Sequence, residues 1–183
     1  MQNGLAILPI NSGSGLEGYR RPFGDAINYF TLKYKPQNAK IISWQDTQRK
    51  MNDNDLITAF QDALVKYQTT SMIDKNVLKK ISQSVGARYL LFIRLGDLQQ
   101  GANVGEDLFG GTIVNRTLGL KAHVLIWDSV DGDIVWECMG GASAEEDEFS
   151  RGLDQNPMSY SNMAARGIIQ QLYQRTFVEE DQE

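Results

Sequence analysis

The chain has 183 residues, of which 42% are hydrophobic and 22% are charged, a composition typical of a globular protein with one buried core. Its formal net charge of -5 disfavours a general role in binding polyanions, although it leaves room for a local basic patch. The single cysteine, Cys138, rules out an intrachain disulfide. The sequence contains no run of the ~18 apolar residues that a bilayer-spanning segment needs.

The first part of the chain alternates strand and helix patterns. Residues 4–10 predict a strand, with Pro9 near its end, where a missing N–H does least damage. Pro22 is predicted to open a helix over residues 23–33, because proline is pre-organised for the first helical turn. A short second strand is expected over residues 40–44.

Helical patterns dominate the next part of the chain. Residues 46–52 predict a helical turn, and residues 55–67 predict a clearer helix with one apolar face. Asp74 is a good N-cap for a third helix, and Gly86 is a typical left-handed residue at its end. The apolar run that follows is dense enough for a central strand covered on both faces: Tyr89, Leu90, Leu91, Phe92 and Ile93.

The later part predicts a hairpin and a final helix. Apolar residues alternate with polar ones over residues 117–126, the period of a strand with one face on a core. The pair Asp131-Gly132 predicts a turn, because both residues tolerate positive φ, and residues 134–138 predict the returning strand.

One domain is the simplest organisation, over residues 1–178, with an acidic and disordered tail over residues 179–183. Asn156-Pro157 marks the start of the last helix. Residues 99–115 predict a long glycine-rich loop within the domain. The resulting order, β-α-β-α-α-β-β-β-α, predicts an α/β (α+β) fold in which helices pack on a mixed sheet.

The loop after the first strand contains a literal G-x-G-x-x-G, formed by Gly13, Gly15 and Gly18 and followed by Arg20 and Arg21. Binding of a nucleotide or small anion here is the alternative function. Two features count against a nucleotide. The helix is predicted to start beyond the glycines, and no acidic residue ends the second strand.

The sequence predicts no catalytic residue, cofactor or metal site. His123 is the only histidine, so a multi-histidine metal site is excluded within one chain. We expect His123 on the outward face of its strand, and Cys138 as a buried, unreactive thiol. The acidic run over residues 145–148 is expected to be a solvated rim, because cation loops space their ligands around a glycine.

The long loop is the segment with most functional promise. We predict that its apolar residues contact a partner protein, although a plain surface loop is the competing interpretation. The predicted contact residues are Val104, Leu108, Phe109 and Ile113. An adjoining unpaired sheet edge could also accept a partner strand.

Three segments resemble a group of periplasmic and outer-membrane lipoproteins that includes CsgG, LpoB and the N-terminal domain of TolB. They are ILPINSGSG at residues 7–15, SVGARYLL at residues 84–91 and WDSVDGDIVW at residues 127–136. The resemblance implies a fold like the TolB N-terminal domain. It also implies a non-catalytic module that is exported, often lipid-anchored through an N-terminal cysteine, and serves an assembly or secretion machine.

The chain departs from that group in lacking an anchoring cysteine and segments long enough for membrane hairpins, and its glycine-rich loop is its own. The resemblance leads us to expect a periplasmic, outer-membrane-associated accessory protein that binds a protein partner and no nucleic acid. A homo-oligomer is compatible with this expectation. Membrane contact is expected only through a lipid anchor that precedes residue 1 in the native protein.

Overall fold

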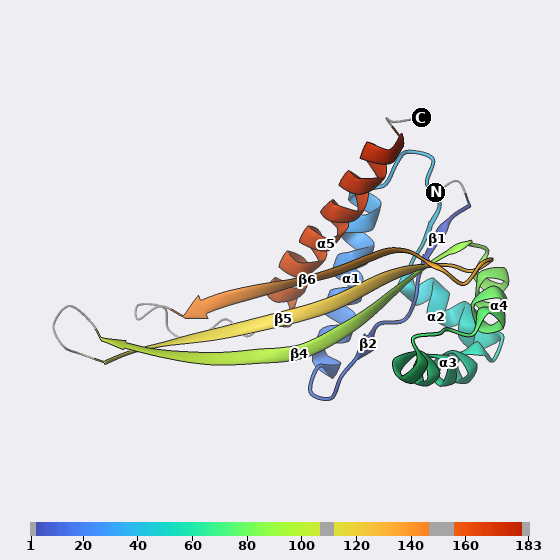
Figure 1. Cartoon of the computed structure of the whole chain (residues 1–183). Coiled ribbons are helices and arrows are strands. Elements are labelled where there is room, and N and C mark those ends of the chain that lie inside the picture. The colour runs from blue at the N-terminus through green and yellow to red at the C-terminus, as the bar shows by residue number, and fades with distance from the viewer. Residues whose placement is uncertain (1–2, 107–111, 147–155, 181–183) are drawn as a thin grey trace.

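The computed structural model describes residues 3–106, 112–146 and 156–180, and describes side chains for residues 3–96, 119–143 and 156–174. Helices and strands pack into one mixed α/β fold (Figure 1), which confirms the predicted class. In chain order the elements are β1 (Leu5–Ile7), β2 (Asn11–Ser12), α1 (Glu17–Tyr34), β3 (Ile41–Ile42), α2 (Trp44–Asp53), α3 (Leu56–Thr70), α4 (Lys75–Val85), β4 (Tyr89–Glu106), β5 (Thr112–Asp128), β6 (Ile134–Glu146) and α5 (Pro157–Glu180).

The sheet has the strand order β3-β1-β4-β5-β6, and β2 also pairs with β4. The strands β1, β2 and β3 are parallel to their neighbours, whereas β4, β5 and β6 form an antiparallel meander. The long strands β4 and β5 extend well past the helices (Figure 1). The fold therefore consists of a helix-covered body and a hairpin arm that projects from it.

Helices cover the two faces of the sheet unequally. The helices α1 and α5 pack against one face, where Phe23, Ile27 and Ile168 meet alternate strand residues such as Leu91 and Val124. The helices α2, α3 and α4 pack against one end of the other face (Figure 1). The core on that side contains Met51, Phe60, Leu78, Ile81, Leu90, Phe92, Leu125 and Trp127. The predicted central strand is therefore buried on both faces, as its apolar run indicated.

The helix caps around α4 match their prediction. The Asp74 carboxylate accepts a hydrogen bond of 2.9 Å from the backbone N–H of Asn76. Gly86 ends the helix at φ 75°, in the left-handed region that costs glycine nothing. The predicted hairpin turn is also present, but only Gly132 adopts a positive φ there, at 77°.

The glycine-rich segment is not a loop, and that prediction was wrong. Residues 99–106 belong to β4 and residues 112–115 belong to β5, in a register that pairs Gln99 with Gly119 and Glu106 with Thr112. Glycine has a weak strand propensity, and the segment lacks a clear period of two. Backbone hydrogen bonds between neighbouring strands do not depend on the side chain, so the pairing prevails over the local pattern.

Two predicted boundaries in the first half were also wrong. Helix α1 begins at Glu17, so Pro22 lies inside it. Pro22 has no backbone N–H, so it cannot donate to the carbonyl oxygen of Gly18, four positions earlier, and the helix continues without that hydrogen bond. Trp44 starts helix α2 and does not end a strand, because the Ser43 hydroxyl caps this helix by accepting the backbone N–H of Asp46 at 3.1 Å.

The described helices include none with the length and hydropathy of a membrane-spanning segment. Helix α5 continues through Glu180, so it includes Glu179 and Glu180 of the tail that we expected to be disordered. Residues 181–183 lie outside the described residues.

Candidate functional site

Strand β6 forms one edge of the sheet. It pairs with β5 from Ile134 to Glu146, and within the described part of the chain it has no strand on its other side. The sequence of β6, IVWECMGGASAEE, contains neither lysine nor proline. Natural edge strands are usually blocked by such residues, by a bulge or by a covering element, and in β6 the bulge lies near the start of the strand, at Val135. The unpaired edge of β6 is therefore a candidate surface for strand addition.

Exposed apolar side chains accompany this edge. Met139 is 74% exposed and Val135 is 52% exposed. Val135 sits at a bulge, because Ile126 pairs with Trp136 while the next residue, Trp127, pairs with Ile134. The bulge places Ile134 and Trp136 on opposite faces and lets Trp136 pack against the α1 and α5 side. The sequence predicted that an unpaired sheet edge beside residues 99–115 could accept a partner strand, but it did not indicate that β6 would be that edge.

The predicted partner-binding residues lie on the arm. Val104 is in β4 and Ile113 is in β5, where Val104 pairs with Val114 and Ile113 pairs with Gly105. Their side chains lie outside those that the structure describes. Leu108 and Phe109 lie wholly outside the described residues. Their proposed contact with a partner stays a prediction.

Gly13 and Gly15 lie in a turn directly before α1, and Gly18 is the second residue of that helix. Gly15 has φ 82°, and the backbone nitrogen of Leu16 lies 3.4 Å from the carbonyl oxygen of Gly13. Because α1 begins at Glu17, its N-terminus directly follows Gly13 and Gly15, contrary to one of the two objections raised above. The Glu17 carboxylate stands in the first turn, however, where its charge opposes binding of an anion.

The two arginines of the alternative anion site have different partners. Arg20 donates from Nε to the Ser12 hydroxyl at 2.6 Å. Nε of Arg21 lies 3.7 Å from Oδ2 of Asp25, and the Arg21 side chain is 86% exposed. A Cβ added at Gly13, Gly15 or Gly18 would meet nothing within 4 Å, so the turn is open and encloses no ligand-sized cradle. The anion site on this loop stays a prediction.

His123 and Cys138 occupy half-buried positions on opposite faces of the sheet. Nε2 of His123 lies 2.6 Å from Oε1 of Glu137, on the neighbouring strand. The thiol of Cys138 lies 2.9 Å from Oε1 of Gln171 in α5 and is only partly buried, so the expectation of a fully buried thiol was wrong. The bulge in β6 shifts the pattern from which that burial was inferred.

Over the residues that the structure describes, no three histidine, cysteine, aspartate or glutamate side chains come together as a metal-binding group. Glu145 and Glu146 of the predicted acidic rim lie at the end of β6, and residues 147–148 are outside the described part.

The chain matches no family model, and no curated protein matches it in sequence. Solved structures do resemble it in chain path. One is a lipoprotein from Neisseria meningitidis, with 11% identity, a TM-score of 0.39, and coverage of 98% of this chain and 99% of the other. Another is the PelC dodecamer from Paraburkholderia phytofirmans, with 12% identity, a TM-score of 0.40, and coverage of 90% and 85%.

The C-terminal domain of LpoB from Salmonella enterica is also similar, with 12% identity, a TM-score of 0.35, and coverage of 76% of this chain and 82% of the other. The proteins similar in chain path thus include bacterial lipoproteins and the C-terminal domain of LpoB. The resemblance to CsgG and TolB stays a prediction. No functional residue is transferred from these proteins.

Proposed function

We propose that this chain is a non-catalytic accessory protein of the bacterial cell envelope, and that it binds a protein partner through the free edge of β6. The observation that carries the proposal is β6 itself, an edge strand of 13 residues. It contains no lysine or proline, and its residues Val135 and Met139 are exposed. A partner strand would add main-chain hydrogen bonds to this edge, and side chains on alternate positions would supply specificity. The sequence motifs at residues 84–91 and 127–136 support the envelope setting.

Replacing Met139 by lysine tests the edge. A lysine on an edge strand hinders pairing with another strand, and Met139 is exposed, so the fold tolerates the change. The matched control is Met163→Lys, at an exposed position on α5. Each variant is expressed from the full reading frame in the source cell, crosslinked and purified, and the crosslinked proteins are identified by mass spectrometry.

We expect a specific envelope protein to crosslink to the wild type and to Met163→Lys, and to be lost from Met139→Lys. Equal crosslinking of all three forms would contradict binding at β6. Fractionation of the same cells, with the mass of the mature N-terminus, tests the location. A processed N-terminus that bears lipid supports the envelope assignment, and an unprocessed cytosolic chain contradicts it.

A further inference from the structure

One face of helix α3 lines two adjoining pockets against the sheet. The first has a volume of about 150 Å³ and the second of about 200 Å³, and they share Leu64. The helix contributes residues at spacings of three and four along its whole length: Ile57, Phe60, Gln61, Leu64, Tyr67 and Gln68. We call the two pockets together the α3 groove.

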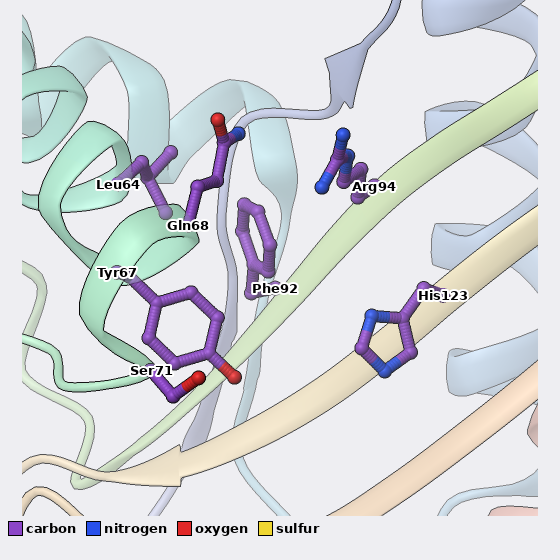
Figure 2. Close-up of a pocket in the computed structure, with 7 residues that line it drawn as sticks. All are labelled: Leu64, Tyr67, Gln68, Ser71, Phe92, Arg94 and His123. Atoms are coloured by element: carbon purple, nitrogen blue, oxygen red, sulfur yellow. The ribbon is translucent and has the colours of Figure 1, made fainter.

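The opposite wall of the α3 groove comes from three strands and from α1. Figure 2 shows the second pocket, with Leu64, Tyr67 and Gln68 of α3 facing Phe92 and Arg94 of β4 and His123 of β5. Asn11 of β2 is the register partner of Arg94 and, with Arg20 of α1, lines the first pocket. Each pocket thus combines an apolar floor with one arginine and amide or hydroxyl groups.

The arginines of the α3 groove lack acidic partners, unlike others in the chain. Arg21, Arg49 and Arg88 each lie within ion-pair distance of an aspartate. Within the part of the chain whose side chains are described, the Arg20 side chain hydrogen-bonds only to the Ser12 hydroxyl. The Arg94 side chain makes neither a hydrogen bond nor an ion pair there.

The lining of both pockets contains no aspartate or glutamate. The Glu137 carboxylate pairs with His123 at one end, and Glu17 lies one helical turn before Arg20 on α1, outside the lining. The two arginines make the lining of the α3 groove positive, in a chain with a net charge of -5.

The dimensions favour an extended polypeptide as the occupant. Each pocket is smaller than the roughly 300–1,000 Å³ of sites for drug-sized ligands and cofactors. The lining on α3 runs from Ile57 to Gln68, about 17 Å at about 1.5 Å per residue. An extended peptide of about five residues has the same length. The amides of Asn11, Gln61 and Gln68 can both donate and accept hydrogen bonds, which suits a peptide backbone.

We propose that the α3 groove binds an extended, acidic peptide segment, with one carboxylate at Arg94, a second at Arg20, and apolar side chains against Phe60, Leu64 and Phe92. This inference rests on the proposed function in one respect: both assume that the protein binds a polypeptide. The groove arginines lie on α1 and β4, whereas strand addition would use the backbone of β6, so Arg94 can be changed without touching the β6 edge.

The test uses the full chain and two pools of fluorescein-labelled nonapeptides. In the first pool, glutamate or aspartate alternates with random apolar residues, and in the second pool lysine replaces every acidic residue. Binding is followed by fluorescence anisotropy for the wild type, Arg94→Gln and the matched control Arg166→Gln, an exposed arginine on α5. Circular dichroism melting verifies that all three remain folded.

We expect saturable binding of the acidic pool, a Kd about tenfold higher for Arg94→Gln, and an unchanged Kd for Arg166→Gln. Met139 is the register partner of His123 at one end of the groove, so Arg94→Gln is the variant that separates the two proposals: it should keep crosslinking at β6 while it weakens peptide binding. No saturable binding of the acidic pool, equal binding of the lysine pool, or an unchanged Kd for Arg94→Gln would overturn the inference. Binding of phosphatidylglycerol vesicles in place of the acidic pool would also overturn it, in favour of a lipid headgroup.

Discussion

Arg88 and Asp128 form a bidentate ion pair that fastens the start of β4 to the end of β5. Nε of Arg88 lies 3.0 Å and 2.9 Å from the two carboxylate oxygens of Asp128, and Nη2 donates to Oδ2 at 2.6 Å. The carboxylate also accepts the backbone N–H of Val130 at 3.0 Å. Asp128 is only 4% exposed, so this pair holds the turn that leads into the β6 edge.

The first prediction concerns the pH dependence of this pair. The hydrogen bond from Arg88 holds the pKa of Asp128 below its usual value, although burial of the carboxyl acts in the opposite direction. A lowered folded-state pKa stabilises the fold above the unfolded pKa of about 3.9, and this contribution is lost as the pH falls through the folded pKa. Asp128→Asn should therefore destabilise the protein at pH 7, and the difference from wild type should shrink below about pH 4.

Urea unfolding at several pH values measures this difference. The midpoint of Asp128→Asn should lie below that of the wild type at neutral pH and approach it in acid. Asp133→Asn, at an exposed position in the same turn, is the control and should change little. A constant gap between wild type and Asp128→Asn at every pH would contradict the ionic origin of the stabilisation.

The second prediction concerns the contact between β6 and α5. A Cβ added at Gly140 would overlap with Cγ1 of Ile168, which is 1% exposed. Gly140→Ala should therefore destabilise the fold by about 1–3 kcal/mol, because a well-packed core has no space for the methyl group. Ile168→Ala should lower the free energy of unfolding by less in the Gly140→Ala protein than in the wild type, because the substitution removes the isoleucine atom that overlaps with the new methyl group.

Gly167 provides the matched control for that substitution. It lies inside α5, and a Cβ there would meet nothing within 4 Å. Gly167→Ala should be neutral or stabilise the protein by up to about 1 kcal/mol, since alanine has the higher helix propensity. Equal thermal unfolding of Gly140→Ala and Gly167→Ala would show that α5 does not pack closely on β6.

The third prediction concerns the caps of α4. Asp74→Ala removes the acceptor for Asn76 and should lower the free energy of unfolding by about 1 kcal/mol. Gly86→Ala places a side chain at φ 75° and should cost a similar amount, about 1 kcal/mol. Gly86→Asn should cost less than Gly86→Ala, because asparagine visits this region more readily. Chemical unfolding curves check all three, and identical curves for Gly86→Ala and Gly86→Asn would contradict the conformational reason.

The fourth prediction concerns the contact between α1 and α5. The buried hydroxyl of Tyr173 donates to the carbonyl oxygen of Thr31 at 3.1 Å. Tyr173→Phe should lower the free energy of unfolding by about 1 kcal/mol, whereas Tyr29→Phe, at a 59% exposed position, should have no effect.

Burial also raises the pKa of the Tyr173 hydroxyl far above its usual value. The folded state therefore favours the protonated phenol. Its stabilising contribution is complete below the unfolded pKa of about 10 and is lost as the pH rises through the folded pKa. In an alkaline absorbance titration, the wild type should ionise one tyrosine only on unfolding, and Tyr173→Phe should lack that step. A step that persists in Tyr173→Phe would contradict the assignment.

Local chemistry determined the features that the sequence predicted correctly. The cap at Asp74, the left-handed glycine at Gly86 and the hairpin turn at Gly132 depend on residues within a few positions of one another. The burial of the central strand follows from the density of its apolar run, because such a run needs cover on both faces. These signals were sufficient for the α/β class and for most of the element order.

Contacts between distant residues decided what the sequence could not indicate. The segment over residues 99–106 becomes a strand because residues 112–119 pair with it, and α1 starts before its proline because Leu16 and Tyr19 are buried in the core. The free edge of β6 follows from strand order, and the α3 groove follows from the packing of α3 on the sheet. Arg20 and Arg94 are far apart in sequence, yet the fold places both along one groove. Their proximity depends on the register between β2 and β4 and on the connection to α1, which the local sequence does not reveal.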